Sequence, residues 1–223
     1  MPGLKTLRGA TRTGPDASAL VVFAKAPQPG RVKTRLAPLL GEYRAARLHA
    51  RMIESTLRKA LRARFARVEL HCAPHARHSI FVRLGRRHSL ALRTQAGGDL
   101  GERMHRAFER ALRTAKVVVL VGTDCPVLRI ADLRAAARAL QGGADAVLAP
   151  AEDGGYALIG LRRTSPRLFS GIEWGGGSVL ADTRRRLREL GWRWRELRTV
   201  WDVDRPGDYR RLELMRSQRH FTR

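Results

Sequence analysis

Four aspartates stand shortly after apolar segments of the kind that form buried strands: Asp124, Asp153, Asp202 and Asp204. The chain has only 20 acidic residues against 44 basic ones, so this concentration of carboxylates is informative. A carboxylate at the end of an apolar strand loses water, which is costly unless a positive group pairs with it. A hard divalent cation is a natural partner, because it prefers oxygen ligands and shares them with substrate phosphates.

Each of these aspartates, taken alone, also has an ordinary structural explanation. Asp124, in the segment TDCP, could cap a helix that begins near residue 130. Asp202 and Asp204, in the segment DVD, could pair with Arg205 or other arginines. Taken as a set, they favour a site for a metal ion and a diphosphate, with Mg²⁺ or Mn²⁺ as the cofactor.

The segment FAKAPQPGRVKTRL, residues 23–36, follows the first apolar run and carries four cations, namely Lys25, Arg31, Lys33 and Arg35. Only five of the 44 basic residues of the chain are lysines, and two of them stand in this loop. A compact ammonium suits a point contact to phosphate better than a planar guanidinium does. We interpret the loop as the phosphate-facing wall of a nucleotide site, opposite an aspartate-held metal.

Short apolar segments alternate with segments that repeat apolar residues at helical spacing. The predicted strands cover 19–24, 66–73, 90–95, 116–122, 144–150, 156–161 and 192–200. The predicted helices cover 41–63, 99–113, 130–140 and 180–190. This alternation predicts a mostly parallel mixed sheet with helices on both faces, that is, a single three-layer α/β/α domain. In such sheets the chemistry gathers at the carboxyl ends of the strands.

The chain is expected to form one domain over residues 19–216, with a loosely attached leader at 1–18 and a tail at 217–223. No apolar run approaches the roughly 18 residues that span a bilayer, so no membrane span is expected. The two cysteines, Cys72 and Cys125, give no disulfide framework, which favours a cytoplasmic location.

The formal net charge of +24 raises the question of nucleic-acid binding. The arginines are scattered through nearly every segment rather than gathered in one stripe, whereas nucleic-acid footprints are usually localised. We therefore expect no specific nucleic-acid partner. Non-catalytic binding of a nucleotide or RNA stays open as an alternative function.

Five motifs occur in an order that matches a known family: FAKAPQPGRVKTRLAP, QAGGDLGERM, VGTDCP, APAEDGGYALIGL and DVDRPGDY. Together they resemble the bacterial glycosyltransferase A-like family of the nucleotide-diphospho-sugar transferase superfamily, over residues 19–212. The first motif is also similar to that of phospholactate guanylyltransferases. The resemblance implies the nucleotide-diphospho-sugar transferase (GT-A-like) fold, a nucleotide at the carboxyl edge of the sheet and a divalent metal.

By this resemblance, cations of the first motif contact phosphates, namely Lys25, Lys33 and Arg35. Asp99 and Arg103, in DLGERM, match a motif near the nucleotide. The metal ligands would be the aspartate after the central strand and the acidic pair of the last motif, namely Asp124, Asp202 and Asp204. The acceptor side would be formed by Gly154, Gly155 and Tyr156.

Two reactions are compatible with these roles. The first is glycosyl transfer from a nucleoside-diphosphate sugar to a small acceptor, with Asp124 and Asp153 as catalytic residues and Asp153 positioning or deprotonating the acceptor hydroxyl. The second is nucleotidyl transfer, in which a phosphorylated acceptor attacks the α-phosphate of a nucleoside triphosphate. The first is our primary hypothesis and the second its alternative.

Overall fold

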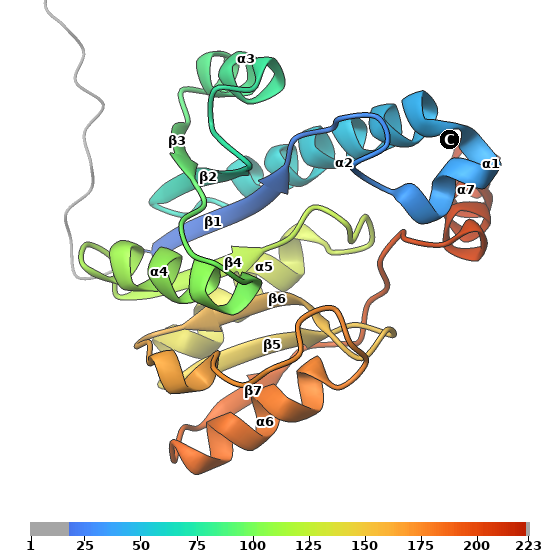
Figure 1. The fold of residues 1–223 in the computed structure, drawn as a ribbon. Helices are drawn as coiled ribbons and strands as arrows, with labels where there is room; N and C mark the ends of the chain where they lie inside the picture. Colours follow the sequence, from blue (N-terminus) through green and yellow to red (C-terminus); the bar gives the residue numbers. More distant parts are fainter. Residues whose placement is uncertain (1–17, 222–223) are drawn as a thin grey trace, which may run out of the picture.

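The computed structural model describes residues 18–221, which form one seven-stranded mixed sheet in the order β3-β2-β1-β4-β6-β5-β7 (Figure 1). The strands are β1 (Ser18–Lys25), β2 (Arg67–Ala73), β3 (Ala91–Thr94), β4 (Val117–Val121), β5 (Ala146–Pro150), β6 (Tyr156–Leu161) and β7 (Trp194–Glu196). All neighbouring pairs are parallel except those of β6, which runs antiparallel to both β4 and β5.

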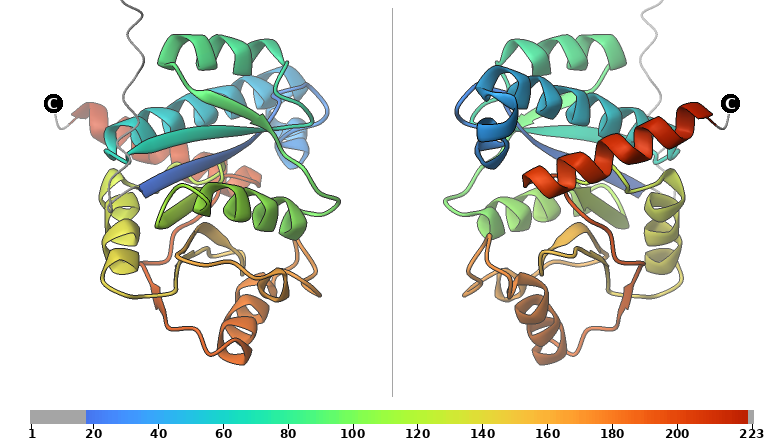
Figure 2. Two further views of the ribbon diagram at one scale, coloured as in Figure 1. Left: turned by 90° about the vertical axis from the view of Figure 1, so that its left-hand side faces the viewer. Right: turned by 90° about the vertical axis from the view of Figure 1, so that its right-hand side faces the viewer.

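Helices cover both faces of this sheet (Figure 2). They are α1 (Ala37–Leu40), α2 (Glu42–Arg62), α3 (Ser79–His88), α4 (Leu100–Leu112), α5 (Ile130–Gln141), α6 (Val179–Glu189) and α7 (Pro206–Phe221), with short 3₁₀ turns at Thr34–Leu36 and Pro166–Leu168. Helices α2, α3 and α5 pack on one face, and α4 and α6 pack on the other. The predicted three-layer α/β/α class is therefore confirmed.

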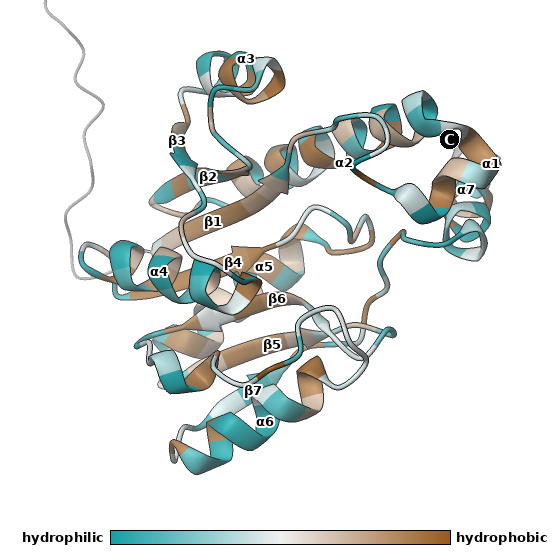
Figure 3. Cartoon of the chain, viewed as in Figure 1, coloured by the Kyte–Doolittle hydropathy of each residue, from teal (hydrophilic) through white to brown (hydrophobic). Residues whose placement is uncertain are grey.

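The alternation of side chains along β1 explains why helices are needed on both sides. Leu20 and Val22 point into the core with α2 and α3, whereas Val21 and Phe23 point into the core with α4 and α6. The central strands are accordingly apolar along their length, as Figure 3 shows for β1, β4 and β5. Strands buried on both faces need apolar residues at every position, which is the pattern that the sequence displays.

Three features differ from the elements expected from the sequence. The segments 79–88 and 206–221 form α3 and α7, for which no helix was predicted, and α7 extends into the residues expected to form a tail. The expected strand at 192–200 is shorter, at Trp194–Glu196, although Val200 still forms an isolated bridge with Ala151. Most of the expected leader lies outside the described residues. No helix among the described residues is long and apolar enough to cross a bilayer.

The carboxyl ends of β1 and β4 lie side by side at the point where the chain order reverses. The connection after β1 passes through α2 on one face, whereas the connection that leads into β4 passes through α4 on the other. After β1 the chain leads to β2 on one side, and after β4 it leads to β5 on the other side, so residues after both strands line a crevice between them. Such a switch point is the usual ligand position in α/β sheets.

Beside β6, the loop after β5 crosses the segment before α6 at close range. Gly154 has a positive φ of 87°, and a Cβ atom at this position would overlap the backbone of Gly177. The carbonyl of Gly154 also accepts a hydrogen bond of 2.8 Å from the amide of Leu180, at the start of α6. Glycine at position 154 is therefore required both by its conformation and by the approach of the other loop.

We expect the substitution Gly154→Ala to lower the free energy of unfolding by about 2–4 kcal/mol, because left-handed strain and overpacking add. Gly191→Ala is the matched control: its φ is 64°, but nothing lies within 4 Å of the added Cβ atom. The control should lose only about 1–2 kcal/mol. Urea denaturation of both variants measures this difference. Equal losses of unfolding free energy would show that the backbone of Gly177 does not restrict position 154.

Candidate active site

Two backbone contacts hold three loops together at the carboxyl edge of the sheet. The amide of Val203 donates a hydrogen bond of 2.9 Å to the carbonyl of Asp124, and the amide of Glu152 donates one of 3.0 Å to the carbonyl of Val200. The loops after β4, β5 and β7 are thereby joined. As a result, the structure gathers the three carboxylates of Asp124, Asp153 and Asp202.

Burial and the crowding of these carboxylates raise the pKa of the Asp202 carboxyl. Its Oδ1 atom is buried and accepts no hydrogen bond from the described residues. Burial and the negative charges of Asp124 and Asp153 raise the pKa of its carboxyl from 3.8 to about 7. A positive group placed among these carboxylates would relieve both effects.

Lys33 partly supplies that charge. Its Nζ lies 2.7 Å from Oδ1 of Asp124, and its side chain is only 4% exposed. Burial raises the pKa of the Asp124 carboxyl, but His49 and Lys33 together outweigh this effect and hold the pKa below its usual range. Lys33 has a positive φ of 50°, a strained conformation for a lysine that the surrounding loop imposes.

His49 of α2 is a site residue that sequence reasoning missed. Its Nε2 donates a hydrogen bond of 3.0 Å to the carbonyl of Lys25, because a carbonyl oxygen can only accept. Its Nδ1 lies 3.5 Å from Oδ1 of Asp124. The side chain is 4% exposed. Its position on the buried face of the predicted helix 41–63, beside Ile53, was the available signal.

The structure pairs two of the predicted residues with each other instead of with the other site residues. Arg35 Nη1 lies 2.6 Å from Oδ2 of Asp204, and both side chains are substantially exposed. Neither residue lines the crevice at the carboxyl edge. The assignment of Asp124, Asp202 and Asp204 as metal ligands stays a prediction; in the structure Asp153 lies with Asp124 and Asp202, whereas Asp204 pairs with Arg35.

A large cavity occupies the crevice between β1 and β4, with a volume of about 920 Å³. Three cations line it, namely Lys25, Arg31 and Arg103, and Asp124 is its one carboxylate. We call it the basic cavity. Its volume lies at the upper end of the roughly 300–1,000 Å³ typical of pockets for drug-sized ligands and cofactors.

Two residues of the DLGERM motif have different positions: Asp99 starts α4, and Arg103 lines the basic cavity. Asp99 caps α4: its Oδ1 accepts a hydrogen bond of 2.8 Å from the amide of Glu102, so its side chain is used in the helix start. Arg103 lines the cavity and is held in place by the carbonyls of Gly97 and Gly98, at 3.2 and 2.9 Å. Arg103 thus has no carboxylate partner among the described residues.

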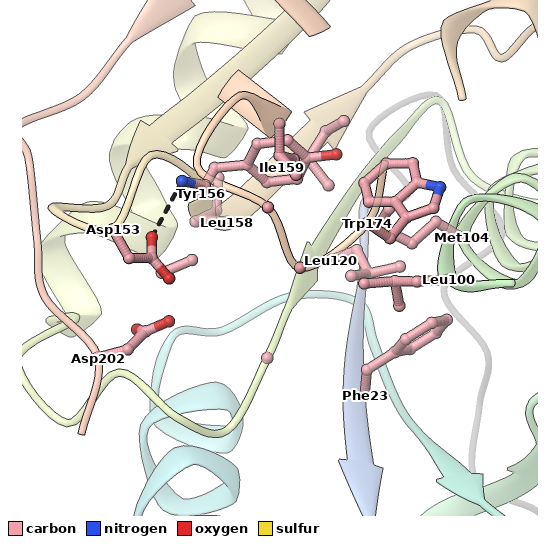
Figure 4. A pocket seen from close by; sticks show the side chains of 16 residues that line it. Phe23, Leu100, Met104, Leu120, Asp153, Tyr156, Leu158, Ile159, Trp174 and Asp202 are labelled. Atoms are coloured by element: carbon pink, nitrogen blue, oxygen red, sulfur yellow. Dashed lines mark hydrogen bonds between the residues drawn. The ribbon is translucent and has the colours of Figure 1, made fainter. Parts of the chain in front are cut away.

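A second, smaller pocket of about 210 Å³ adjoins the basic cavity, and Phe23, Leu100 and Gly122 line both. We call it the apolar pocket. Figure 4 shows its two ends: the carboxylates of Asp153 and Asp202 lie at one end, and aromatic and aliphatic side chains lie at the other. The two compartments share the wall formed by the three residues common to both, and each also reaches the carboxylates: Asp124 lines the basic cavity, and Asp153 and Asp202 line the apolar pocket.

The residues expected on the acceptor side divide between these roles. Gly155 and Tyr156 line the apolar pocket, and the amide of Gly155 donates a hydrogen bond of 2.9 Å to Oδ1 of Asp153. Gly154 does not line it and serves the loop crossing described above. Trp174 was missed as a lining residue, although the glycine run that follows it marked a chain segment able to approach a ligand.

A divalent cation fits this donor set. Asp124 Oδ1 is buried against Lys33, while the side chain as a whole is 48% exposed, so its second oxygen faces the cavity. Asp202 offers a buried oxygen without a donor. Among residues 18–221, no three His, Cys, Asp or Glu side chains form a ready-made metal cage. Mg²⁺ typically uses one or two carboxylates and completes its shell with water and substrate phosphates.

We expect Asp202→Asn to stabilise the metal-free protein in a pH-dependent way. Asp202 ionises near pH 4 in the unfolded chain but at about 7 in the fold, so the folded state binds the extra proton between these values. The stability contributed by this group therefore falls as the pH rises from 4 to 7. The variant should match the wild type near pH 4.5 and exceed it by about 1–3 kcal/mol at pH 8.

Urea denaturation in EDTA at both pH values measures this difference. Asp204→Asn is the matched control, because the Asp204 carboxylate pairs with Arg35 at an exposed position. The control should gain nothing at either pH and lose at most about 1 kcal/mol. If Asp202→Asn and the wild type were equally stable at pH 8, the carboxylates would not be crowded.

The fold and the sequence are both similar to those of known proteins. A proposed nucleotide-diphospho-sugar transferase from Desulfovibrio desulfuricans G20 is 32% identical, with a TM-score of 0.78, covering 85% of this chain and 83% of its own. The CMP:2-keto-3-deoxy-manno-octonic acid synthetase complexed with CTP is 12% identical, with a TM-score of 0.60 and coverages of 92% and 100%.

Rv0371c from Mycobacterium tuberculosis H37Rv, in a complex with manganese, is 21% identical, with a TM-score of 0.51 and coverages of 88% and 97%. These two more distant matches concern the fold. No curated protein matches the sequence.

Residues 56–176 match the family described as uncharacterized proteins conserved in bacteria, DUF2064. This match covers more than half of the chain, and it agrees with the resemblance to the nucleotide-diphospho-sugar transferase superfamily that the motifs indicated. The chain is a member of the DUF2064 family and has the nucleotide-diphospho-sugar transferase fold.

Proposed function

We propose that this protein is a metal-dependent glycosyltransferase that moves a sugar from a nucleoside-diphosphate sugar to a small hydroxyl acceptor. One observation carries the proposal: a cation-lined cavity and a separate pocket adjoin, and three crowded carboxylates are divided between their walls. A cavity with three cations suits a diphosphate, and a neighbouring pocket that ends in carboxylates suits the group that accepts the sugar.

The comparisons support a nucleotide-using transferase. The most similar of the structures reported above is a proposed nucleotide-diphospho-sugar transferase, and a more distant one binds CTP. The manganese complex of a third supports the use of a divalent cation by this fold. Mg²⁺ or Mn²⁺ would be held here by Asp124 and Asp202, with Asp153 beside them.

In this proposal the residues of the basic cavity bind the donor. Lys25, Arg31 and Arg103 contact the diphosphate, and Lys33 adds charge beside Asp124. When bound, the metal ion supplies positive charge that stabilises the departing diphosphate. The crevice walls orient the donor so that its anomeric carbon faces the apolar pocket.

Asp153 orients the acceptor. Its Oδ1 is fixed by the amide of Gly155, so the carboxylate can accept a hydrogen bond from an acceptor hydroxyl. The hydroxyl oxygen bonds to the anomeric carbon as the bond from that carbon to the diphosphate oxygen breaks. The hydroxyl proton passes to Asp153, and the bonding electrons leave with the nucleoside diphosphate.

Nucleotidyl transfer is the second candidate, favoured by the number of cations in the basic cavity. A triphosphate carries more charge than a diphosphate, and the structure complexed with CTP has the same fold. In that reaction an acceptor oxygen bonds to the α-phosphorus and pyrophosphate leaves. Non-catalytic nucleotide or RNA binding, the third candidate, requires no metal and weakens steeply with salt.

We expect one nucleoside diphosphate, triphosphate or nucleotide sugar to raise the melting temperature in the presence of Mn²⁺. Ligand at 100 times its dissociation constant adds roughly 2.7 kcal/mol, which corresponds to about 5–10 °C for a chain of this size. Asp124→Asn should lose this metal-dependent gain, because it removes a carboxylate that faces the basic cavity. Asp204→Asn should keep it, because Asp204 lies outside both compartments.

A melting panel with and without Mn²⁺, followed by product analysis with the stabilising nucleotide, performs this test. Full metal-dependent stabilisation of Asp124→Asn would contradict the metal site. Release of pyrophosphate from a triphosphate would replace glycosyl transfer with nucleotidyl transfer. Stabilisation that needs no metal and collapses with salt would favour non-catalytic binding.

A further inference from the structure

The apolar pocket contains no cation, although the chain is rich in them. Of the 223 residues of the protein, 44 are lysine or arginine. Among the sixteen described residues that line this pocket, none is lysine, arginine or histidine. The adjoining basic cavity has three cations and a histidine. Positive charge is therefore confined to one side of the junction between the two compartments.

This charge distribution bears on which acceptor can enter. A phosphate or carboxylate is bound by arginine, lysine or clustered backbone donors, and its desolvation is costly without them. The apolar pocket instead presents two carboxylates, Asp153 and Asp202, at one end (Figure 4). With Asp202 assigned to the metal ion, an anionic group there would still meet the carboxylate of Asp153 without a lysine or arginine partner, so the pocket disfavours a phosphorylated acceptor.

Many side chains in the pocket wall offer no hydrogen-bond partner. Phe23, Leu100, Met104 and Leu120 face it with carbon atoms, and Trp174 faces it with its ring (Figure 4). The indole nitrogen of Trp174 lies against Gly101 of α4. A polyhydroxylated molecule would bury hydroxyl groups against these walls without partners, at a cost of about 1–3 kcal/mol for each group.

We propose that the acceptor is an uncharged alcohol with an apolar body of about the size of one ring, its hydroxyl at the Asp153 end. The pocket volume of about 210 Å³ sets the size, since it is below the roughly 300–1,000 Å³ of pockets that enclose drug-sized ligands. This inference rests on the proposed glycosyl transfer and names its acceptor class. The alcohol oxygen forms the new bond to the anomeric carbon, and the diphosphate departs.

Ligand-observed NMR titration of the full chain tests the proposal without a donor. The probes are benzyl alcohol, benzyl phosphate and glycerol, each with Mg²⁺ and with EDTA. Benzyl alcohol should bind saturably under both conditions, and neither of the other probes should displace it at a tenfold higher concentration. Benzyl phosphate that displaces the alcohol at equal concentration, or an alcohol that shows no saturable binding, would overturn the proposal.

A charge-insertion variant shows whether this binding occurs in the apolar pocket. Leu100 lies in the wall that the two compartments share and is 42% exposed, so Leu100→Arg places a cation at the edge of the apolar pocket. This variant should weaken benzyl alcohol binding at least fivefold and should allow benzyl phosphate to displace the alcohol at a concentration at least fivefold lower. Leu214→Arg is the matched control, because Leu214 of α7 is 64% exposed and lines neither compartment.

The control should change neither affinity by more than twofold, and circular dichroism of both variants verifies their folding. An unchanged preference in folded Leu100→Arg would overturn the proposal. The assay also separates this inference from the proposed function. Alcohol binding without transfer from any nucleotide sugar would refute the function and uphold the pocket assignment. Sugar transfer only to phosphorylated acceptors would uphold the function and refute the acceptor class.

Discussion

The contact between the Lys33 ammonium and the Asp124 carboxylate is the interaction on which the site depends. Three carboxylates share one edge of the sheet, and this lysine is the cation that reaches their centre, at 2.7 Å from Asp124. The pairing persists although Lys33 has a left-handed backbone and a buried side chain. Local strain of this kind survives only where the surrounding structure imposes it, and it is characteristic of functional sites. One ammonium offsets one carboxylate, so the cluster retains negative charge for a further cation.

The rest of the edge serves to hold that charge in place. The loops after β4 and β7 are joined through Val203 and Asp124, and the end of β1 is fixed to α2 through His49. On the far side, Gly154 allows the loop after β5 to touch the segment that starts α6. These contacts are backbone hydrogen bonds or buried side chains, so the carboxylates cannot simply move apart when they repel one another. The backbone therefore keeps the repelling carboxylates close together, and a bound cation can relieve this repulsion.

The fold could be predicted from the sequence because its signals are local. Central strands buried on both faces are continuous apolar runs, and most helices show a clear apolar stripe. Helix α7 was missed because few of its positions are buried apart from Leu212. The pairing of Arg35 with Asp204 was also invisible, since 169 positions separate these residues in the chain. Composition located the carboxylates, whereas only the folded geometry shows which of them lie together.

The same limit applies to the apolar pocket, whose lining comes from segments as distant as Phe23 and Trp174. Each of these residues looks like an ordinary core position in the sequence, and the absence of cations around them becomes visible only in three dimensions. The chain has an excess of 24 positive charges, so a pocket without lysine or arginine among its lining residues is unexpected. The two compartments thus differ in the charge of their lining side chains. In the proposed reaction this difference would favour the nucleotide in the basic cavity and keep it out of the acceptor position, which is specificity achieved by repulsion as much as by attraction.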